Sequence, residues 1–181
     1  MSFSIRKAAP ADARAISEIA AEHMTTPRSL PRNGDNGFLM VPVSEEDYVR
    51  QIEVFTHSYV AEKDGRVAGY FLGSTVENIQ KFYDGKKTPG TMADIIATCA
   101  PDDVYIFQVA AGKKNQRQGV LRNIFNYFDG YVEKKARLLA HIVHVPVKNT
   151  ASIQLFKGQG YALISELTYD GWTLGLYEKR S

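Results

Sequence analysis

The chain has 181 residues, 44% of them hydrophobic and 23% charged, with a formal net charge of +2 and a single cysteine, Cys99. This composition excludes wholesale disorder, an intrachain disulfide, and recruitment of nucleic acid or a membrane through the overall charge, and no apolar run approaches the roughly 20 residues that cross a bilayer. The length of the chain and its even composition lead us to expect one globular domain over residues 1–181. Because the N-terminus lacks the apolar core of a signal peptide, we expect this domain to work in the reducing cytoplasm.

The first half of the sequence mixes strand and helix patterns. From the N-terminus it predicts a strand over 3–7, a helix from Pro10 to His23, a long loop over 25–43, a helix from Ser44 to about Phe55, and strands over 58–62 and 67–75. The loop follows from three prolines and two glycines. Asp64-Gly65 between the two strands predicts an antiparallel hairpin.

The second half continues the same mixture. It predicts two short helices around a loop in 77–101, a strand over 105–111, a helix over 121–132, an apolar strand over 138–145, a helix over 150–157, and two strands around Asp170-Gly171. This order is typical of an α+β, or mixed α/β, fold with one sheet.

The turn between residues 112 and 119 joins the strand at 105–111 to the following helix. It carries Lys113, Lys114 and Arg117 and no acid, and Arg122 follows in the helix. Unpaired backbone N–H groups and the positive end of the dipole at a helix start bind anions. The pattern therefore predicts a site for phosphate groups of a nucleotide-like ligand.

Two motifs point to a family. Gln116-Arg117-Gln118-Gly119 lies in this turn, and residues 149–161 read NTASIQLFKGQGY. Together they resemble the motifs of the GNAT superfamily of N-acetyltransferases. The resemblance implies a single, mostly antiparallel mixed sheet flanked by helices, with a cleft between its central strands, and it implies acetyl-CoA as the co-substrate.

The resemblance also implies which residues bind acetyl-CoA. Backbone groups of the turn would hold the pyrophosphate, the end of the preceding strand would follow the pantetheine arm, and the later motif would line the other side of the cleft. The residues in these roles are Val109, Ala110, Ala111, Gln116, Arg117, Gln118, Gly119, Val120, Leu121, Arg122, Asn149, Ser152 and Phe156. Leu121 replaces a small residue of the family motif.

Catalytic groups are harder to identify. Phe156 stands where many members have a tyrosine that protonates the thiolate, and phenylalanine has no proton to give. Tyr105 stands where some members carry a glutamate base, and His144 could relay a proton through water because a histidine pKa lies near 6.5. Since His141 and His144 alternate along one strand, at most one of them can address the site.

The function that this pattern favours is transfer of the acetyl group of acetyl-CoA to a primary amine by direct attack in a ternary complex. A non-catalytic acyl-CoA-binding module is the alternative, because no base is obvious, and a nucleic-acid-binding protein fits less well because Phe125 and Phe128 lie on the apolar face of their helix. No His, Cys, Asp and Glu spacing indicates a metal. The expected partner is a small-molecule or peptide amine, and we expect no nucleic-acid or membrane partner. The sequence does not decide between a monomer and a homodimer.

Overall fold

The computed structural model describes residues 3–26, 28–84, 90–132 and 136–180. Its strands are β1 (Ser4–Lys7), β2 (His57–Lys63), β3 (Arg66–Thr75), β4 (Val104–Ala111), β5 (Arg137–Val145), β6 (Ala162–Tyr169) and β7 (Trp172–Arg180). Its α-helices are α1 (Ala13–His23), α2 (Glu45–Val54), α3 (Val76–Tyr83), α4 (Gly90–Thr98), α5 (Val120–Asp129) and α6 (Thr150–Gly158), and short 3₁₀ turns are η1 (Pro10–Asp12) and η2 (Lys113–Asn115). The predicted α+β class is confirmed.

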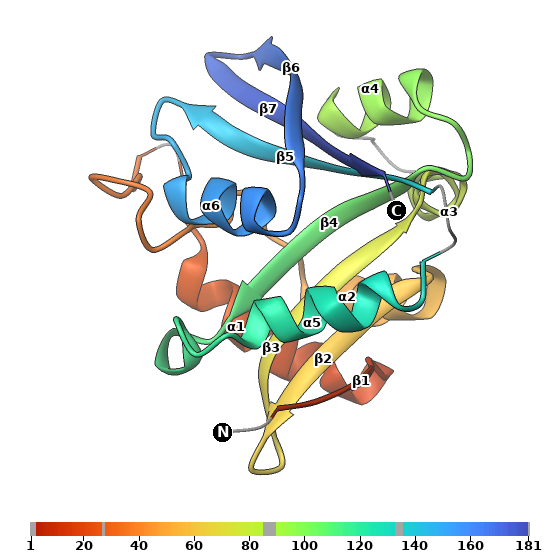
Figure 1. Cartoon of the computed structure of the whole chain (residues 1–181), viewed down its shortest axis with the longest axis vertical. Coiled ribbons are helices and arrows are strands. Elements are labelled where there is room, and N and C mark those ends of the chain that lie inside the picture. Colours follow the sequence, from red (N-terminus) through yellow and green to blue (C-terminus); the bar gives the residue numbers. More distant parts are fainter. Residues whose placement is uncertain (1–2, 27, 85–89, 133–135, 181) are drawn as a thin grey trace.

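The strands form one seven-stranded sheet in the order β1-β2-β3-β4-β5-β7-β6. Every neighbouring pair is antiparallel except β4 and β5, which are parallel and adjacent at the centre. Figure 1 shows β4 and β5 diverging along their length, with the hairpin of β6 and β7 beyond them. The predicted single, mostly antiparallel mixed sheet is therefore confirmed.

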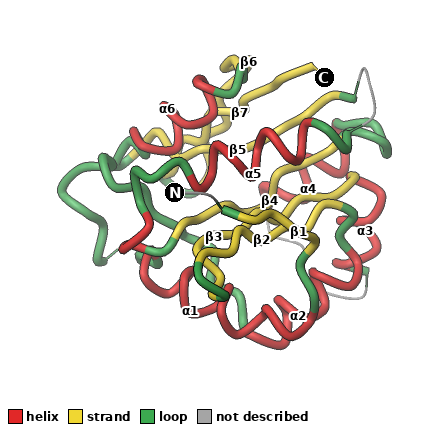
Figure 2. Tube along the Cα trace, turned by 60° about the horizontal axis from the view of Figure 1, so that its bottom comes forward, coloured by secondary structure: helices red, strands yellow, loops and turns green. Residues whose placement is uncertain are grey.

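Helices cover both faces of the sheet. Figure 2 shows α1 and α2 on one side of β1 to β4, and α5 on the opposite side. The first face packs on a core that includes Ile16, Tyr48 and Tyr105, and the other face packs on a core that includes Phe71 and Phe125. Because strand residues alternate between faces, these two cores divide each central strand between them.

Local sequence signals explain where several helices begin. Ser44 accepts a hydrogen bond from the Asp47 N–H at the start of α2, and Thr75 accepts one from the Asn78 N–H at the start of α3. The predicted helix after Pro10 begins instead as a 3₁₀ turn, because the buried Asp12 carboxylate accepts the Ala9 N–H and pairs with Arg6. The α-helix itself starts at Ala13, directly after this turn.

The structure differs from the sequence-based boundaries in one further place. Helix α5 ends at Asp129, before Gly130, and Val132 packs against the core from outside the helix. The loop expected between the two short helices includes 85–89, which lie outside the described residues. No helix in the part of the chain that the structure describes is long and apolar enough to cross a membrane.

Candidate functional site

The central cleft arises because β4 and β5 stop pairing early. They pair at Val104 with Leu138 and at Tyr105 with Leu139, although β4 continues to Ala111 and β5 to Val145. Beyond Tyr105, backbone groups of β4 that point toward β5 have no partner in that strand, and a cleft opens. Two cavities occupy it, one of about 620 Å³ and one of about 320 Å³.

A β-bulge in β4 lies next to the point of divergence. Leu72 of β3 pairs with Gln108 and Gly73 pairs with Ile106, which leaves Phe107 as the extra residue. A bulge shifts the alternation of side chains by one position. Gln108 and Ala110 therefore lie on the same face of the sheet as Tyr105.

The larger cavity is called the turn cavity here, because the turn after β4 forms its floor. It is lined by His23, 35–39, 109–111, 115–117, 119–122, 151–152 and 154–155. Arg117 and Gly119 both have positive φ angles, +60° and +82°, and such turns bring successive N–H groups to one side. Within α5 the first hydrogen bond runs from the Asn123 N–H to the Gly119 carbonyl, so the N–H groups of 120–122 have no partner within the helix.

The turn cavity has the geometry and charge of an anion site. A Cβ at Gly119 would meet no atom within 4 Å, so the backbone there is open to a ligand. Arg117 and Arg122 contribute positive charge, and Asp35 contributes one carboxylate. Lys113 donates its backbone N–H to Glu22, which fixes the start of the turn.

The loop over 25–43 lines both cavities. It is attached to the start of α6, where Asn149 donates through Nδ2 to the Phe38 carbonyl and the Ala151 N–H donates to the Gly34 carbonyl. The side chain of Gln116, in the turn after β4, also donates to the Asn36 carbonyl of this loop. Asn149 has a second role, because its Oδ1 caps α6 by accepting the Ser152 N–H.

The smaller cavity is called the strand cavity here, because it lies between β4 and β5. It is lined by 38–41, Tyr83, Met92, 105–109, 140–143, Asn149, Ser152, Phe156, Tyr169, Trp172 and Leu174. The two cavities share four lining residues, Phe38, Leu39, Val109 and Ser152, which form the junction between them.

Three polar side chains line the strand cavity along β4 and β5. The Tyr105 hydroxyl lies 3.4 Å from Nδ1 of His141. Burial raises the pKa of Tyr105 and lowers the pKa of His141 to about 4, against a weak opposing effect of Asp94. At neutral pH the phenol is protonated and the imidazole is neutral, so one ring nitrogen of His141 has a free lone pair, although burial makes it a weaker base than an exposed histidine.

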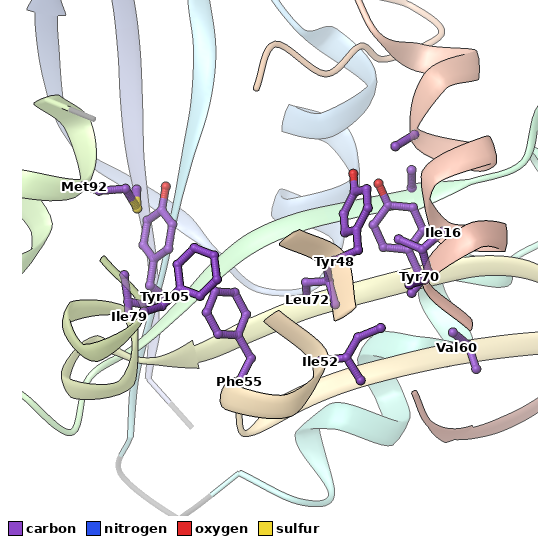
Figure 3. Packing of buried hydrophobic residues seen from close by; sticks show 14 of the residues in the cluster. Ile16, Tyr48, Ile52, Phe55, Val60, Tyr70, Leu72, Ile79, Met92 and Tyr105 are labelled. Atoms are coloured by element: carbon purple, nitrogen blue, oxygen red, sulfur yellow. The ribbon is translucent and has the colours of Figure 1, made fainter. Parts of the chain in front are cut away.

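The third polar side chain, Gln108, is held by a buried network. The hydroxyls of Tyr48 and Tyr70 donate to its Oε1 at 2.7 and 2.6 Å. Its Nε2 is 3.5 Å from the Val41 carbonyl. Figure 3 shows the hydroxyl ends of Tyr48 and Tyr70 close together, while Tyr105 lies farther along the sheet beside Met92.

Most of the predicted site residues lie around these cavities. Those lining the turn cavity are Val109, Ala110, Ala111, Gln116, Arg117, Gly119, Val120, Leu121, Arg122 and Ser152. Those lining the strand cavity are Tyr105, Val109, Asn149, Ser152 and Phe156. Gln118 lines neither, because its side chain accepts from Lys63 and donates to the Lys114 carbonyl. Phe156 packs edge-on against Phe125 and Tyr161.

The two histidines of β5 do not share a site, as the alternation predicts. His141 lines the strand cavity, whereas His144 lines neither cavity. His144 lies 2.6 Å from a Glu166 carboxylate oxygen and 3.1 Å from the Tyr177 hydroxyl, on the β6 and β7 side. Sequence reasoning named His144 as the candidate, considered His141 only as its alternative, and did not consider Gln108. The alternation separated the histidines, but no local signal indicated which face carries the cleft.

Candidate metal ligands do not cluster among the residues that the structure describes: no group of three or more His, Cys, Asp or Glu side chains is placed to hold an ion. Cys99 is a partly buried free thiol whose pKa is raised by burial.

Comparison with known proteins is consistent across sequence and fold. Residues 24–161 match the family model described as acetyltransferase (GNAT) family. An N-acetyltransferase from Staphylococcus aureus Mu50 superposes with a TM-score of 0.63 at 15% identity, covering 97% of this chain and 100% of that one. Ard1 from Thermoplasma volcanium gives 0.66 at 12% identity, covering 99% and 98%. The ribosomal-protein-S18-alanine N-acetyltransferase from Escherichia coli gives 0.60 at 14% identity, covering 99% and 94%. Among curated proteins nothing matches.

Proposed function

The chain belongs to the GNAT acetyltransferase family and is an acyltransferase, and we propose that it transfers the acetyl group of acetyl-CoA to a primary amine by direct attack in a ternary complex. The observation that carries this proposal is the junction of two cavities at Phe38, Leu39, Val109 and Ser152. One cavity suits a phosphate-bearing ligand and the other suits an organic acceptor. Direct transfer requires both ligands to be bound at once.

The lining of the turn cavity suits CoA in its chemistry. The unpaired N–H groups at the start of α5, with Arg117 and Arg122, would hold the pyrophosphate. The small side chains of Ala110 and Ala111 leave room for the pantetheine arm beside β4. When bound, the cofactor supplies an activated acetyl group as a thioester.

Backbone groups of β4 would orient the thioester at the junction. Beyond Tyr105, alternate N–H groups on the β5 side of the strand have no partner in β5. An N–H group fixed at that position can donate to a carbonyl oxygen as negative charge develops on it. The Ser152 hydroxyl lines both cavities and can donate a hydrogen bond to the leaving sulfur, while the proton that the amine loses balances the one that the thiolate takes up.

His141 is the group placed to receive the proton of the amine. It lines the strand cavity, and its pKa of about 4 leaves it neutral at physiological pH. The Tyr105 hydroxyl beside its Nδ1 orients the ring and can pass the proton through water. We propose His141 in this role in place of His144, which is held by Glu166 and Tyr177 outside both cavities.

The proposal is tested by following thiol release from acetyl-CoA in the presence of a panel of primary amines. Release that depends on both protein and amine, with a matching acetylated product by mass spectrometry, is the expected result. Tight acetyl-CoA binding without amine-dependent release across the panel would favour the non-catalytic acyl-CoA-binding module instead.

A further inference from the structure

The strand cavity, which the proposed function assigns to the acceptor, has an apolar and aromatic lining. Its outer wall is formed by Tyr83 and Met92 of α3 and α4 and by Tyr169, Trp172 and Leu174 of the β6 and β7 hairpin. Its volume of about 320 Å³ is at the small end of the usual range for small-molecule sites. The space suits a compact organic body.

Carboxylates are missing from this lining. None of the described residues that line the strand cavity is Asp or Glu, and the sequence of 85–89, GKKTP, contains none either. Asp94 acts on His141 electrostatically but is not part of the lining. A polyamine or an aminosugar keeps further ammonium groups after one amine has reacted, and each would need a charged partner on entering an apolar cavity.

Two aromatic side chains of the cavity lining come from the strands of one hairpin, Tyr169 from β6 and Trp172 from β7. Tyr169 lies over Gly90 at the start of α4, where an added Cβ would sit 3.4 Å from the ring. Trp172 lines the same cavity from the other strand of the hairpin. Aromatic side chains in a cavity lining can pack favourably against an aromatic ligand.

The polar groups of the lining suit a single uncharged amine. Tyr105, His141 and Gln108 line the cavity along β4 and β5. The Oε1 of Gln108 is already occupied by Tyr48 and Tyr70, so its amide presents only N–H donors. The neutral imidazole of His141 has a lone-pair nitrogen that can accept a hydrogen bond from the amine.

From these observations we infer that the acceptor is a primary amine with one nitrogen on a short aromatic or apolar body, such as an arylalkylamine, and not a polyamine or an aminosugar. The inference rests on the proposed function, because it names the acceptor of that same reaction.

An acceptor panel provides the first test. 2-Phenylethylamine, putrescine, spermidine and kanamycin are compared at equal concentration and fixed acetyl-CoA. We expect kcat/KM for 2-phenylethylamine to exceed each of the other three by at least about tenfold. A higher kcat/KM for spermidine, putrescine or kanamycin would overturn the inference while supporting the proposed acetyl transfer.

The only tryptophan of the chain, Trp172, provides a second test that does not depend on turnover. Its fluorescence, excited beyond the tyrosine absorption band, is titrated with 2-phenylethylamine in the presence of CoA. We expect a saturable change, and no such change with spermidine. Saturation with spermidine alone, or with neither amine, would overturn the acceptor class.

A matched pair of variants locates the binding site. Tyr169→Ala removes a ring that lines the strand cavity, and Tyr131→Ala removes a ring that lines neither cavity. The two tyrosines are matched in exposure, because each is 60% exposed. We expect Tyr169→Ala to raise the dissociation constant of 2-phenylethylamine about three- to tenfold and Tyr131→Ala to leave it unchanged. Equal effects of the two would place the amine elsewhere.

Adding a carboxylate tests the charge argument. Val41 lines the strand cavity and is 49% exposed, so Val41→Glu places a charge at the rim without burying it. The variant should improve kcat/KM for putrescine relative to 2-phenylethylamine, and an unchanged ratio would count against the inference. Acetyl-CoA binding is measured on every variant by calorimetry. If the wild-type protein did not bind acetyl-CoA, the proposed function itself would fail, whatever the acceptor.

Discussion

The Tyr105 hydroxyl lies 3.4 Å from Nδ1 of His141 at the last pair of residues that joins β4 to β5. Tyr105 pairs with Leu139, and His141 follows two positions later on the same face of β5. The two side chains therefore meet where the strands begin to separate. This contact places a protonated phenol and a neutral imidazole together on the wall of the strand cavity.

Replacing His141 should reduce turnover more than binding. His141→Gln keeps a hydrogen-bonding side chain but cannot be protonated, so we expect kcat to fall by about 10²-fold or more while the dissociation constant of acetyl-CoA stays unchanged. Tyr105→Phe should have a smaller effect, because it removes only the group that orients the ring. Steady-state kinetics and calorimetry measure the two quantities.

His144→Gln is the control for this assignment. It replaces the other histidine of β5, which contacts Glu166 and Tyr177 outside the cavities. A small effect on kcat is expected. A loss of kcat larger than that of His141→Gln would assign the proton to His144 and contradict the present mechanism.

Acid should destabilise the fold through two partly buried histidines. Burial lowers the pKa of His57 and of His141 from 6.5 to about 4. Between these values the unfolded chain binds protons at both positions and the folded chain does not, so the free energy of unfolding falls as the pH falls from 6.5 to about 4. Urea denaturation at stepped pH values should show this slope, and His57→Gln combined with His141→Gln should flatten it. An unchanged slope in the double variant would contradict the burial argument.

The Gln108 network should contribute to stability through its two tyrosine hydroxyls. Gln108→Leu leaves the hydroxyls of Tyr48 and Tyr70 buried without their acceptor. The expected cost is about 1–3 kcal/mol for each hydroxyl, measured by urea denaturation. Adding Tyr48→Phe and Tyr70→Phe to the Leu variant should recover part of the loss. No recovery would mean that the loss comes from packing.

Replacing Asn149 should lower both the stability of the fold and the affinity for acetyl-CoA. Asn149→Ala removes the cap of α6 and the bond to the Phe38 carbonyl, so it should lower stability by about 0.5–2 kcal/mol and also weaken acetyl-CoA binding. Ser44→Ala is the matched control, because it removes the cap of α2, whose start lines neither cavity. The control should lose comparable stability and keep its affinity. Equal affinities for the two variants would remove Asn149 from the site.

Local patterns predicted most of the elements and the turn cavity. The basic turn, the positive end of α5 and the motif at 149–161 are contiguous segments whose residues act close to their own backbone. Such features depend on short-range geometry, so spacing along the chain is sufficient to find them. The prolines and glycines of residues 25–43 likewise predict a long loop.

The strand cavity could not be predicted in the same way. The bulge at Phe107 shifts the alternation in β4, which brings Gln108 to the face of Tyr105, and nothing in the local sequence marks it. The choice between His141 and His144 depends on the register of β5 against β4 and β7, which is set by contacts between distant segments. Local spacing carries no information about that register.

The central claim is that the turn cavity binds acetyl-CoA, and calorimetry with a pair of glycine variants tests it most directly. Gly119 and Gly65 have φ angles of +82° and +71°, and neither would place a Cβ within 4 Å of another atom. Each change to alanine should therefore cost about 1–2 kcal/mol of stability through backbone strain alone.

Gly119 lies in the turn cavity, whereas Gly65 lies in the hairpin between β2 and β3. The account predicts that the wild-type protein and Gly65→Ala bind acetyl-CoA equally and that Gly119→Ala binds it at least about tenfold more weakly, because it distorts the N–H groups that face the phosphates. Wild-type protein that releases no binding heat with millimolar acetyl-CoA, or equal affinity in all three proteins, would contradict it.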